Sequence, residues 1–204
     1  MRWLLLIILV LVGFNLFGQN GYVKVSRDST IIGFIKRYTS HMDGSRGLEV
    51  WRTKKDSQPI RVKMSSIYEF AIKKDTFRIL YDFSPFASEN IYFEFVEAQI
   101  ISTGKVTLLK IDALSDLKRG TQSIMINSGG GPVSVMTFRN DNFTYVLEEP
   151  VTDYLQALPY EQQKLFEVLK DFFPERYLVR YRQEYGDITY SKVPALVKLY
   201  NSVQ

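Results

Sequence analysis

Apolar and polar residues alternate in short runs between residues 21 and 148, and clusters of Gly, Pro, Ser, Asn and Asp separate these runs. A repeat of two places apolar side chains on one face of a strand, and closely spaced turn residues connect one short strand to the next. Aromatic residues make up 14% of the chain, and they favour the cross-strand pairs of a sheet. The pattern predicts a β-rich domain over residues 21–148, folded as an antiparallel sheet, a sandwich or an open barrel.

The first hairpin of this region is predicted over residues 21–37. Tyr22 begins an apolar run, residues 26–29 have turn chemistry, and Thr30 begins the return strand. Gly33 lies inside the return strand, where a glycine indicates either a bulge or a close approach of two backbones. We therefore expect a tight hairpin at the start of the sheet.

The apolar repeat changes to a helical one after Pro150. Positions i, i+3, i+4 and i+7 form the stripe of a first helix: Leu165, Val168, Leu169 and Phe172. Pro174 ends that helix and suits the first turn of the next one, and Ser191 is a candidate N-cap for a third. Residues 151–204 are therefore predicted to form about three helices packed on the β-rich domain, which makes the fold class α+β.

Residues 1–18 differ in character from the rest of the chain. Arg2 precedes an unbroken apolar run over residues 3–12, which is typical of a secretory signal peptide. The run is shorter than the roughly 20 apolar residues that a membrane-spanning helix needs. Gly13, Phe14, Leu16 and Phe17 bring it close to that length, so an uncleaved N-terminal anchor is the alternative. We expect an exported protein that is periplasmic, associated with the outer membrane or secreted.

The composition limits the chemistry and the partners of such a protein. The chain contains no cysteine, which excludes disulfides, cysteine-ligated metals and attachment through an acylated cysteine. Its net charge is +4, and this falls by one unit if Arg2 leaves with the signal peptide. Such a charge is too small for a nucleic-acid footprint. We therefore expect no nucleic-acid partner, and contact with a membrane only through residues 1–18 if they are not cleaved.

No motif in the sequence assembles a nucleophile, a cofactor site or a metal site. His41 is the single histidine, and the chain has no G-x-S-x-G motif that would present a nucleophile. The glycine-rich run at residues 128–132 precedes a strand-like segment, whereas phosphate-binding loops lead into a helix. We expect no cofactor and no metal, and both features are interpreted as ordinary loops.

Acidic residues allow the alternative of a carboxylate-dependent hydrolase. Glycoside hydrolysis needs two acids roughly 5–9.5 Å apart across a cleft. Glu94 and Glu97 lie on opposite faces of a simple strand, but the apolar alternation slips between Phe95 and Val96, and the β-bulge that this predicts would change their facing. Glu148 and Glu149 are adjacent at a strand end, where we expect both to be solvated. With Asp141 as a further candidate, the sequence offers carboxylates but does not bring two of them together.

Three parts of the sequence resemble uncharacterised exported proteins of Bacteroidota: the hairpin with Gly21-Tyr22-Val23, Asp28-Ser29 and Gly33-Phe34-Ile35, the segment 64–70, and the helical tail that closes with residues 196–201. In that family a G-Y-V…D-T…G-x-I hairpin follows the signal peptide, and this chain has Ser29 where the pattern usually has Thr. The resemblance implies an envelope location and a β-then-α layout, but no activity. Asp28-Ser29-Thr30 also resembles the D-S/T-x acceptor for O-glycosylation in that phylum, which makes Ser29 a candidate glycosylation site.

These features favour a non-catalytic binding or scaffolding module of the cell envelope over an enzyme. Its partner would be another envelope protein, or a glycan that stacks on aromatic side chains. A carboxylate-dependent hydrolase acting on glycan or peptide is the first alternative. The second is a carrier of a small ligand or lipid, in which inward-facing aromatic residues line the cavity of a half-open barrel.

Overall fold

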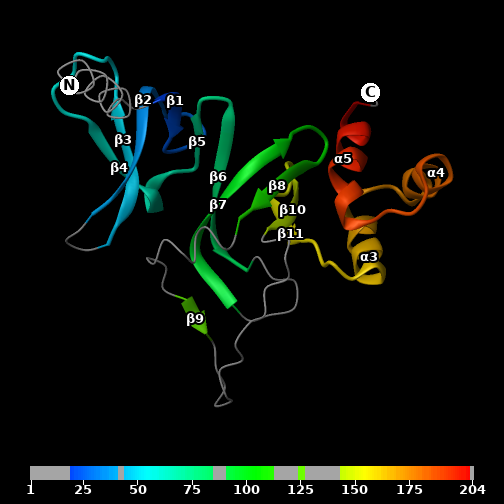
Figure 1. Cartoon of the computed structure of the whole chain (residues 1–204). Helices are drawn as coiled ribbons and strands as arrows, with labels where there is room; N and C mark the ends of the chain where they lie inside the picture. Colours follow the sequence, from blue (N-terminus) through cyan, green and yellow to red (C-terminus); the bar gives the residue numbers. More distant parts are fainter. Residues whose placement is uncertain (1–18, 41–43, 85–90, 113–123, 127–142, 203–204) are drawn as a thin grey trace, which may run out of the picture. The chain divides into compact units, whose positions relative to one another are not determined.

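A computed structural model of the chain describes residues 19–40, 44–84, 91–112, 124–126 and 143–202. The predicted antiparallel sheet is confirmed: its strand order is β11-β10-β8-β7-β6-β5-β1-β2-β3-β4, and β9 pairs with β7 (Figure 1). The strands are β1 (Gln19–Lys24), β2 (Thr30–Thr39), β3 (Arg46–Trp51), β4 (Ile60–Lys63), β5 (Glu69–Ile72), β6 (Asp75–Phe83), β7 (Ile91–Ser102), β8 (Thr107–Ile111), β9 (Ile124–Ile126), β10 (Thr144–Glu149) and β11 (Tyr154–Ala157).

Three helices follow the sheet, as the sequence predicts: α3 (Gln162–Phe172), α4 (Glu175–Tyr185) and α5 (Val193–Ser202). Two 3-10 turns are η1 (Met64–Ser66) and η2 (Tyr190–Lys192). The fold class is therefore α+β. Within the described ranges, no helix combines the length and the apolar character that crossing a membrane requires.

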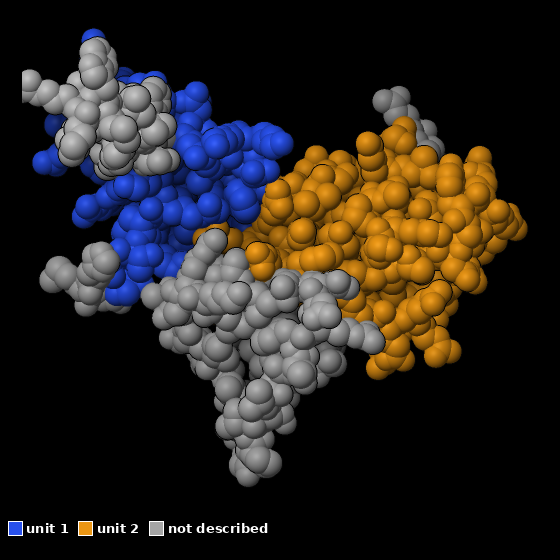
Figure 2. All heavy atoms as spheres, in the orientation of Figure 1, with its two compact units in different colours: residues 1–79 blue, residues 80–204 orange. Residues whose placement is uncertain are grey.

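The chain divides into two compact units, residues 1–79 and residues 80–204 (Figure 2). The division falls inside β6, so the first unit contains β1 to β5 and the second contains β7 to β11 and the helices. The sequence-based division into residues 21–148 and 151–204 follows the change from strands to helices. As a division into domains it stays a prediction.

The first unit begins with the predicted hairpin, in which β1 and β2 pair with Val23 opposite Ile31. β3 and β4 continue the meander beyond β2, and β5 pairs with the other side of β1. Because side chains alternate between faces along a strand, these strands share an inner face. It carries buried apolar residues of the first unit: Val23, Ile35, Leu48, Val50, Val62 and Phe70.

Gly21 and Gly33 are directly opposite each other on β1 and β2. A Cβ atom on Gly21 would lie 1.9 Å from the carbonyl oxygen of Ala71 in β5, and one on Gly33 would lie 2.3 Å from that of Trp51 in β3. Neither position has room for a side chain. Of the two explanations predicted for Gly33, the close backbone approach is therefore correct, and the β1–β2 register continues through it without a bulge.

The second unit buries apolar residues on both faces of its strands. Leu108 of β8 and Leu147 of β10 form one cluster with the apolar stripes of α3, α4 and α5. Their sequence neighbours Leu109 and Val146 point the other way and belong to a second cluster, together with residues of β6 and β7. The predicted helical stripes are thus buried against β8 and β10.

Aromatic rings pack where β10 meets the helical part. Tyr190 stacks on Tyr145 and on Tyr160, with ring centroids 5.1 and 4.0 Å apart. The hydroxyl of Tyr190 accepts a hydrogen bond of 2.7 Å from the backbone N–H of Tyr145, and burial raises the pKa of Tyr190. These aromatic residues therefore serve internal packing.

The sequence predicts the start of α4 better than the start of α5. Pro174 is the N-cap of α4, immediately before its first turn. Ser191 does not cap α5, because it lies inside η2, which leads directly into the helix at Val193. The backbone N–H of Val193, the first residue of α5, donates to the carbonyl of Tyr190 in the 3-10 turn. The turn itself therefore provides the backbone hydrogen bond that a side-chain cap would otherwise supply.

Asn201, in the last turn of α5, holds that helix on the connection between β7 and β8. Its side-chain oxygen accepts a hydrogen bond from the N–H of Val106 at 3.1 Å, and its amide nitrogen donates to the carbonyl of Val106 at 2.7 Å. In the same connection, a Cβ atom on Gly104 would lie 2.5 Å from the Asn201 side chain. The closing residues 196–201 thus include a side chain with a defined structural role.

We expect Asn201→Ala to lower the free energy of unfolding by about 1–3 kcal/mol, because the N–H and the carbonyl of Val106 both lose their partner. Ser202→Ala is the matched control, since Ser202 is exposed at the next position; it should change that free energy by less than about 0.5 kcal/mol. Urea unfolding followed by circular dichroism measures both. Coincident curves for the two variants would contradict a stabilising role of Asn201.

Candidate functional site

The structure separates the carboxylates that the sequence offers as catalytic candidates. Glu94 is exposed whereas Glu97 is 8% exposed, so the two carboxylates lie in different environments on β7. Glu149 is exposed as expected, but the expectation that Glu148 is solvated is wrong, because Glu148 is only 4% exposed. The reason is that β10 is still paired at this position, with Glu148 opposite Thr107 of β8.

The two buried acids of the second unit do not form a pair. Glu148 lies two residues from Val146 and therefore faces the same side as the cluster that contains Val146. Glu97 lies between Val96 and Ala98, which both belong to that cluster, so its side chain faces the opposite side. Carboxylates on opposite faces of a sheet cannot act on one bond. In the ranges that the structure describes, no group of three or more His, Asp or Glu could hold a metal ion.

Several other candidates from the sequence, namely His41, Asp141 and residues 128–132, lie outside the described residues. Ser29 is described and is exposed in the turn between β1 and β2, where its carbonyl accepts a hydrogen bond from the N–H of Val25 at 3.1 Å. Its glycosylation stays a prediction.

A hollow of about 470 Å³ lies between the start of α3 and the end of α4. Arg182 lies in its wall, over the ring of Phe166 at 5.3 Å and paired with Asp187 at 3.0 Å. The other acids of the wall have lysine partners three residues further along the helix: Glu161 with Lys164, and Glu167 with Lys170. The charges of this hollow therefore compensate one another within the second unit.

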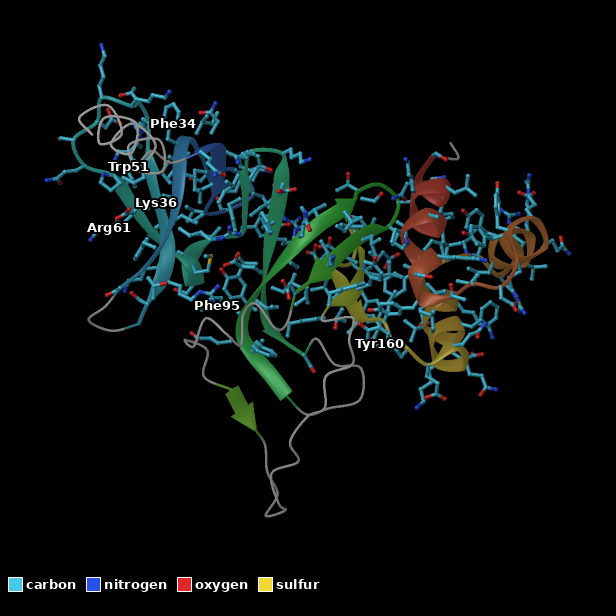
Figure 3. The ribbon with its side chains drawn as sticks, in the orientation of Figure 1. Phe34, Lys36, Trp51, Arg61, Phe95 and Tyr160 are labelled. Atoms are coloured by element: carbon cyan, nitrogen blue, oxygen red, sulfur yellow. The ribbon has the colours of Figure 1, made fainter. Side chains whose placement is uncertain are left out.

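The first unit presents a different kind of surface on the face of β1 to β4 that lies opposite its core, which we call the outer face. By the strand registers, this face carries Tyr22, Lys24, Ile32, Phe34, Lys36, Tyr38, Glu49, Trp51, Arg61 and Lys63. Phe34 on β2 and Trp51 on β3, both labelled in Figure 3, are register partners, and both side chains are half-buried. Ile32, two residues before Phe34, is 74% exposed.

Cations lie over the aromatic rings of the outer face. Three such pairs have a distance of 5.2–5.7 Å between the cation and the ring centroid: Lys24 over Tyr22, Lys54 over Phe34, and Arg61 over Tyr38. A contact of this kind is attractive by about 0.5–1 kcal/mol at an exposed site. The rings therefore keep positive charge close to the sheet.

The hairpin of β3 and β4 concentrates positive charge. Residues 46–63 contain six basic and two acidic residues, so this hairpin alone carries +4, which equals the net charge of the whole chain. Both acids have partners: Glu49 pairs with Arg61 at 3.0 Å, and Asp56 accepts hydrogen bonds from Thr53. Among the described residues, no ion pair engages Lys63, or Lys36 on the neighbouring strand β2.

A second group of charged side chains, on β1, β5 and β6, forms ion pairs among its own members. Lys24, Glu69 and Arg78 are register partners across these three strands. Glu69 accepts hydrogen bonds from Lys24 at 2.9 Å, from Tyr22 at 2.7 Å and from Arg78 at 3.4 Å. Burial alone would raise the pKa of Glu69, but these partners hold the pKa of this carboxyl below its usual range. This group therefore stabilises the sheet.

Sequence reasoning missed the outer face because it considered the charge of the whole chain. A count over residues 46–63 alone finds the local concentration of basic residues. Phe34 and Lys36 are two residues apart, as are Glu49 and Trp51, so a strand assignment places each pair on one face. What the sequence does not give is the register that brings Phe34 opposite Trp51.

Comparison of the chain with known protein families, with curated proteins and with solved structures finds no match. The outer face supplies apolar contact through its rings and attraction for anions through its cations.

We expect the stabilisation by Glu69 to depend on pH. Because the pKa of Glu69 is lower in the folded chain, its carboxylate stabilises the fold above the ordinary glutamate pKa of about 4.3. This contribution is lost as the pH falls through the folded-state pKa. Glu69→Gln should therefore lower the free energy of unfolding by about 1–3 kcal/mol at neutral pH, and the difference should shrink between about pH 5 and pH 3.

Denaturant unfolding at a series of pH values measures this difference. Glu167→Gln is the control, because the side chain of Glu167 is 69% exposed; an exposed pair of this kind contributes less than about 1 kcal/mol. A destabilisation by Glu69→Gln that is the same at every pH would contradict the assignment.

Proposed function

We propose that this protein is a non-catalytic binding module of the cell envelope, which holds an anionic partner against the outer face of its first unit. The observation that carries the proposal is the placement of Phe34, Trp51 and two lysines, Lys36 and Lys63, on one face of three neighbouring strands. Aromatic side chains are enriched in the buried centres of binding interfaces. Positive charge around such a centre attracts and orients an anionic partner.

The distribution of paired charges supports the first unit as the binding unit. In the helical part, several basic residues have carboxylate partners close in sequence, among them Arg180 with Glu184 at 2.7 Å and Arg182 with Asp187 at 3.0 Å. Such pairs largely cancel the field that an approaching anion would meet. The hairpin over residues 46–63 has four more basic than acidic residues. Ion pairs within the hairpin therefore cannot cancel its positive electrostatic field.

An envelope location is consistent with this function. The apolar leader over residues 1–18 favours export, and a bacterial envelope presents anionic glycans, proteins and lipids. A hydrolase is less well supported, because the two buried acids Glu97 and Glu148 face opposite sides of the sheet. A binding function without catalysis therefore accounts better for the arrangement of the described residues.

We expect the protein to bind fluorescently labelled dextran sulfate and not neutral dextran, as measured by fluorescence anisotropy. Replacing both Lys36 and Lys63 by Gln should weaken binding about tenfold or more, since each close charge pair contributes about 1 kcal/mol even in water. Raising the salt concentration should also weaken the binding of the unaltered protein, because salt screens the attraction between charges.

The matched control replaces Lys164 and Lys198 by Gln, which removes the same charge from exposed positions on α3 and α5. This variant should bind nearly as tightly as the unaltered protein. Equal weakening by both double variants would show that only the net charge matters, and the outer face would then not be the binding surface.

A further inference from the structure

We infer that the anionic partner is a phospholipid bilayer, and that the outer face of the first unit docks on its surface. This inference rests on the proposed function and names the partner of the same face. It differs from the expectation from the sequence that only residues 1–18 contact a membrane. Three features carry it: an exposed aliphatic side chain beside the aromatic pair, a surrounding set of lysine and arginine side chains, and the position at which the apolar leader joins the sheet.

The first feature is Ile32, which is 74% exposed on the outer face. It lies opposite Tyr22 on β1 and two residues from Phe34, whose register partner is Trp51. Exposure of this apolar side chain to water is unfavourable. At the boundary between lipid headgroups and acyl chains the side chain is buried. Trp and Tyr are enriched at that same boundary. The group therefore has the composition of a surface that lies in a membrane interface.

The second feature is the basic hairpin around this apolar group. Lys54 lies over Phe34 at 5.2 Å, and Lys36 and Lys63 are exposed on β2 and β4. Long basic side chains can pack their methylene groups along apolar surface while the charge stays at the level of the headgroups. Each cation close to an anionic bilayer strengthens binding about fivefold. Several cations together can thus hold a face that inserts only a few apolar side chains.

The third feature is the exit point of the leader. Residues 1–18 precede Gln19, and the next residue, Asn20, is the register partner of Phe34. Because Phe34 is in turn opposite Trp51, the chain enters the sheet two strands away from Trp51, or about 10 Å. A leader that crosses or has just left the bilayer therefore delivers this part of the sheet to the membrane surface.

A glycan fits the same face less well. A sugar ring stacks on an open aromatic face and offers hydroxyl groups for hydrogen bonds. Here Lys54 covers the ring of Phe34, and Ile32 has no group that could hydrogen-bond to a hydroxyl. The aliphatic exposure and the charge together favour a bilayer that contains anionic lipid.

The chain offers a direct reporter for this inference. It contains two tryptophans, Trp3 in the leader and Trp51 on the outer face. The exported form that lacks residues 1–18 keeps every described strand and helix, which begin at Gln19, and Trp51 is then its single tryptophan. With vesicles of phosphatidylglycerol and phosphatidylcholine we expect the emission of Trp51 to shift to shorter wavelength. Vesicles of phosphatidylcholine alone should leave it unchanged.

Ile32→Ser tests the apolar contribution and should weaken vesicle binding about fivefold or more, since burial of an isoleucine side chain is lost. Its control is Val151→Ser, because Val151 is 90% exposed but belongs to the second unit; this variant should bind vesicles like the unaltered protein. Both positions are exposed, and thermal melts of the two variants should coincide with that of the unaltered protein.

The outcomes separate this inference from the proposed function. Binding to dextran sulfate without any shift of Trp51 on anionic vesicles would overturn the bilayer and leave an anionic glycan or protein as the partner. A Trp51 shift of equal size on neutral vesicles, or equal loss of vesicle binding in Ile32→Ser and Val151→Ser, would also overturn it. Failure to bind both dextran sulfate and anionic vesicles would remove the proposed function as well.

Discussion

Gly21 and Gly33 leave no space for a side chain between the central strands of the first unit, and the close pairing of β1 with β5 and of β2 with β3 depends on this contact. Carbonyl groups of β5 and β3 occupy the positions that Cβ atoms would take, and the core side chains Ile35 and Val50 close in on the same two glycines. Beside the two glycines, the inner face carries aliphatic residues together with Phe70. Larger side chains of the same strands, among them Phe34 and Trp51, lie on the outer face, where they can meet a partner.

Aromatic and basic residues have different roles in the two units. In the second unit, Tyr190 stacks on Tyr145 and Tyr160, and Arg180 and Arg182 of α4 pair with nearby acids. These rings and charges are satisfied within the second unit. On the outer face of the first unit, rings are half-buried under cations, and Lys36 and Lys63 have no acidic partner among the described residues. This contrast, rather than the mild net charge of the chain, is the argument for a binding surface.

The sequence predicts the fold class well because each element depends on a local pattern. The first hairpin follows from the turn at residues 26–29, and the helices follow from the stripe that includes Leu165 and Leu169. The burial of Glu148 was not predictable, because it depends on pairing with β8, which is more than 30 residues away in sequence. The outer face was missed for the same reason: Phe34 and Trp51 meet only through the β2–β3 register. No local pattern reports that register.

The central claim, that the outer face is covered by a partner in the envelope, can be tested by lysine acetylation read out by mass spectrometry on intact envelopes and on purified protein. Lys36, Lys54 and Lys63 should be modified more slowly in envelopes than in the purified protein, whereas the exposed helix lysines Lys164 and Lys198 should react equally in both. Equal reactivity of all five lysines in the two samples, or protection confined to the helices, would contradict the account.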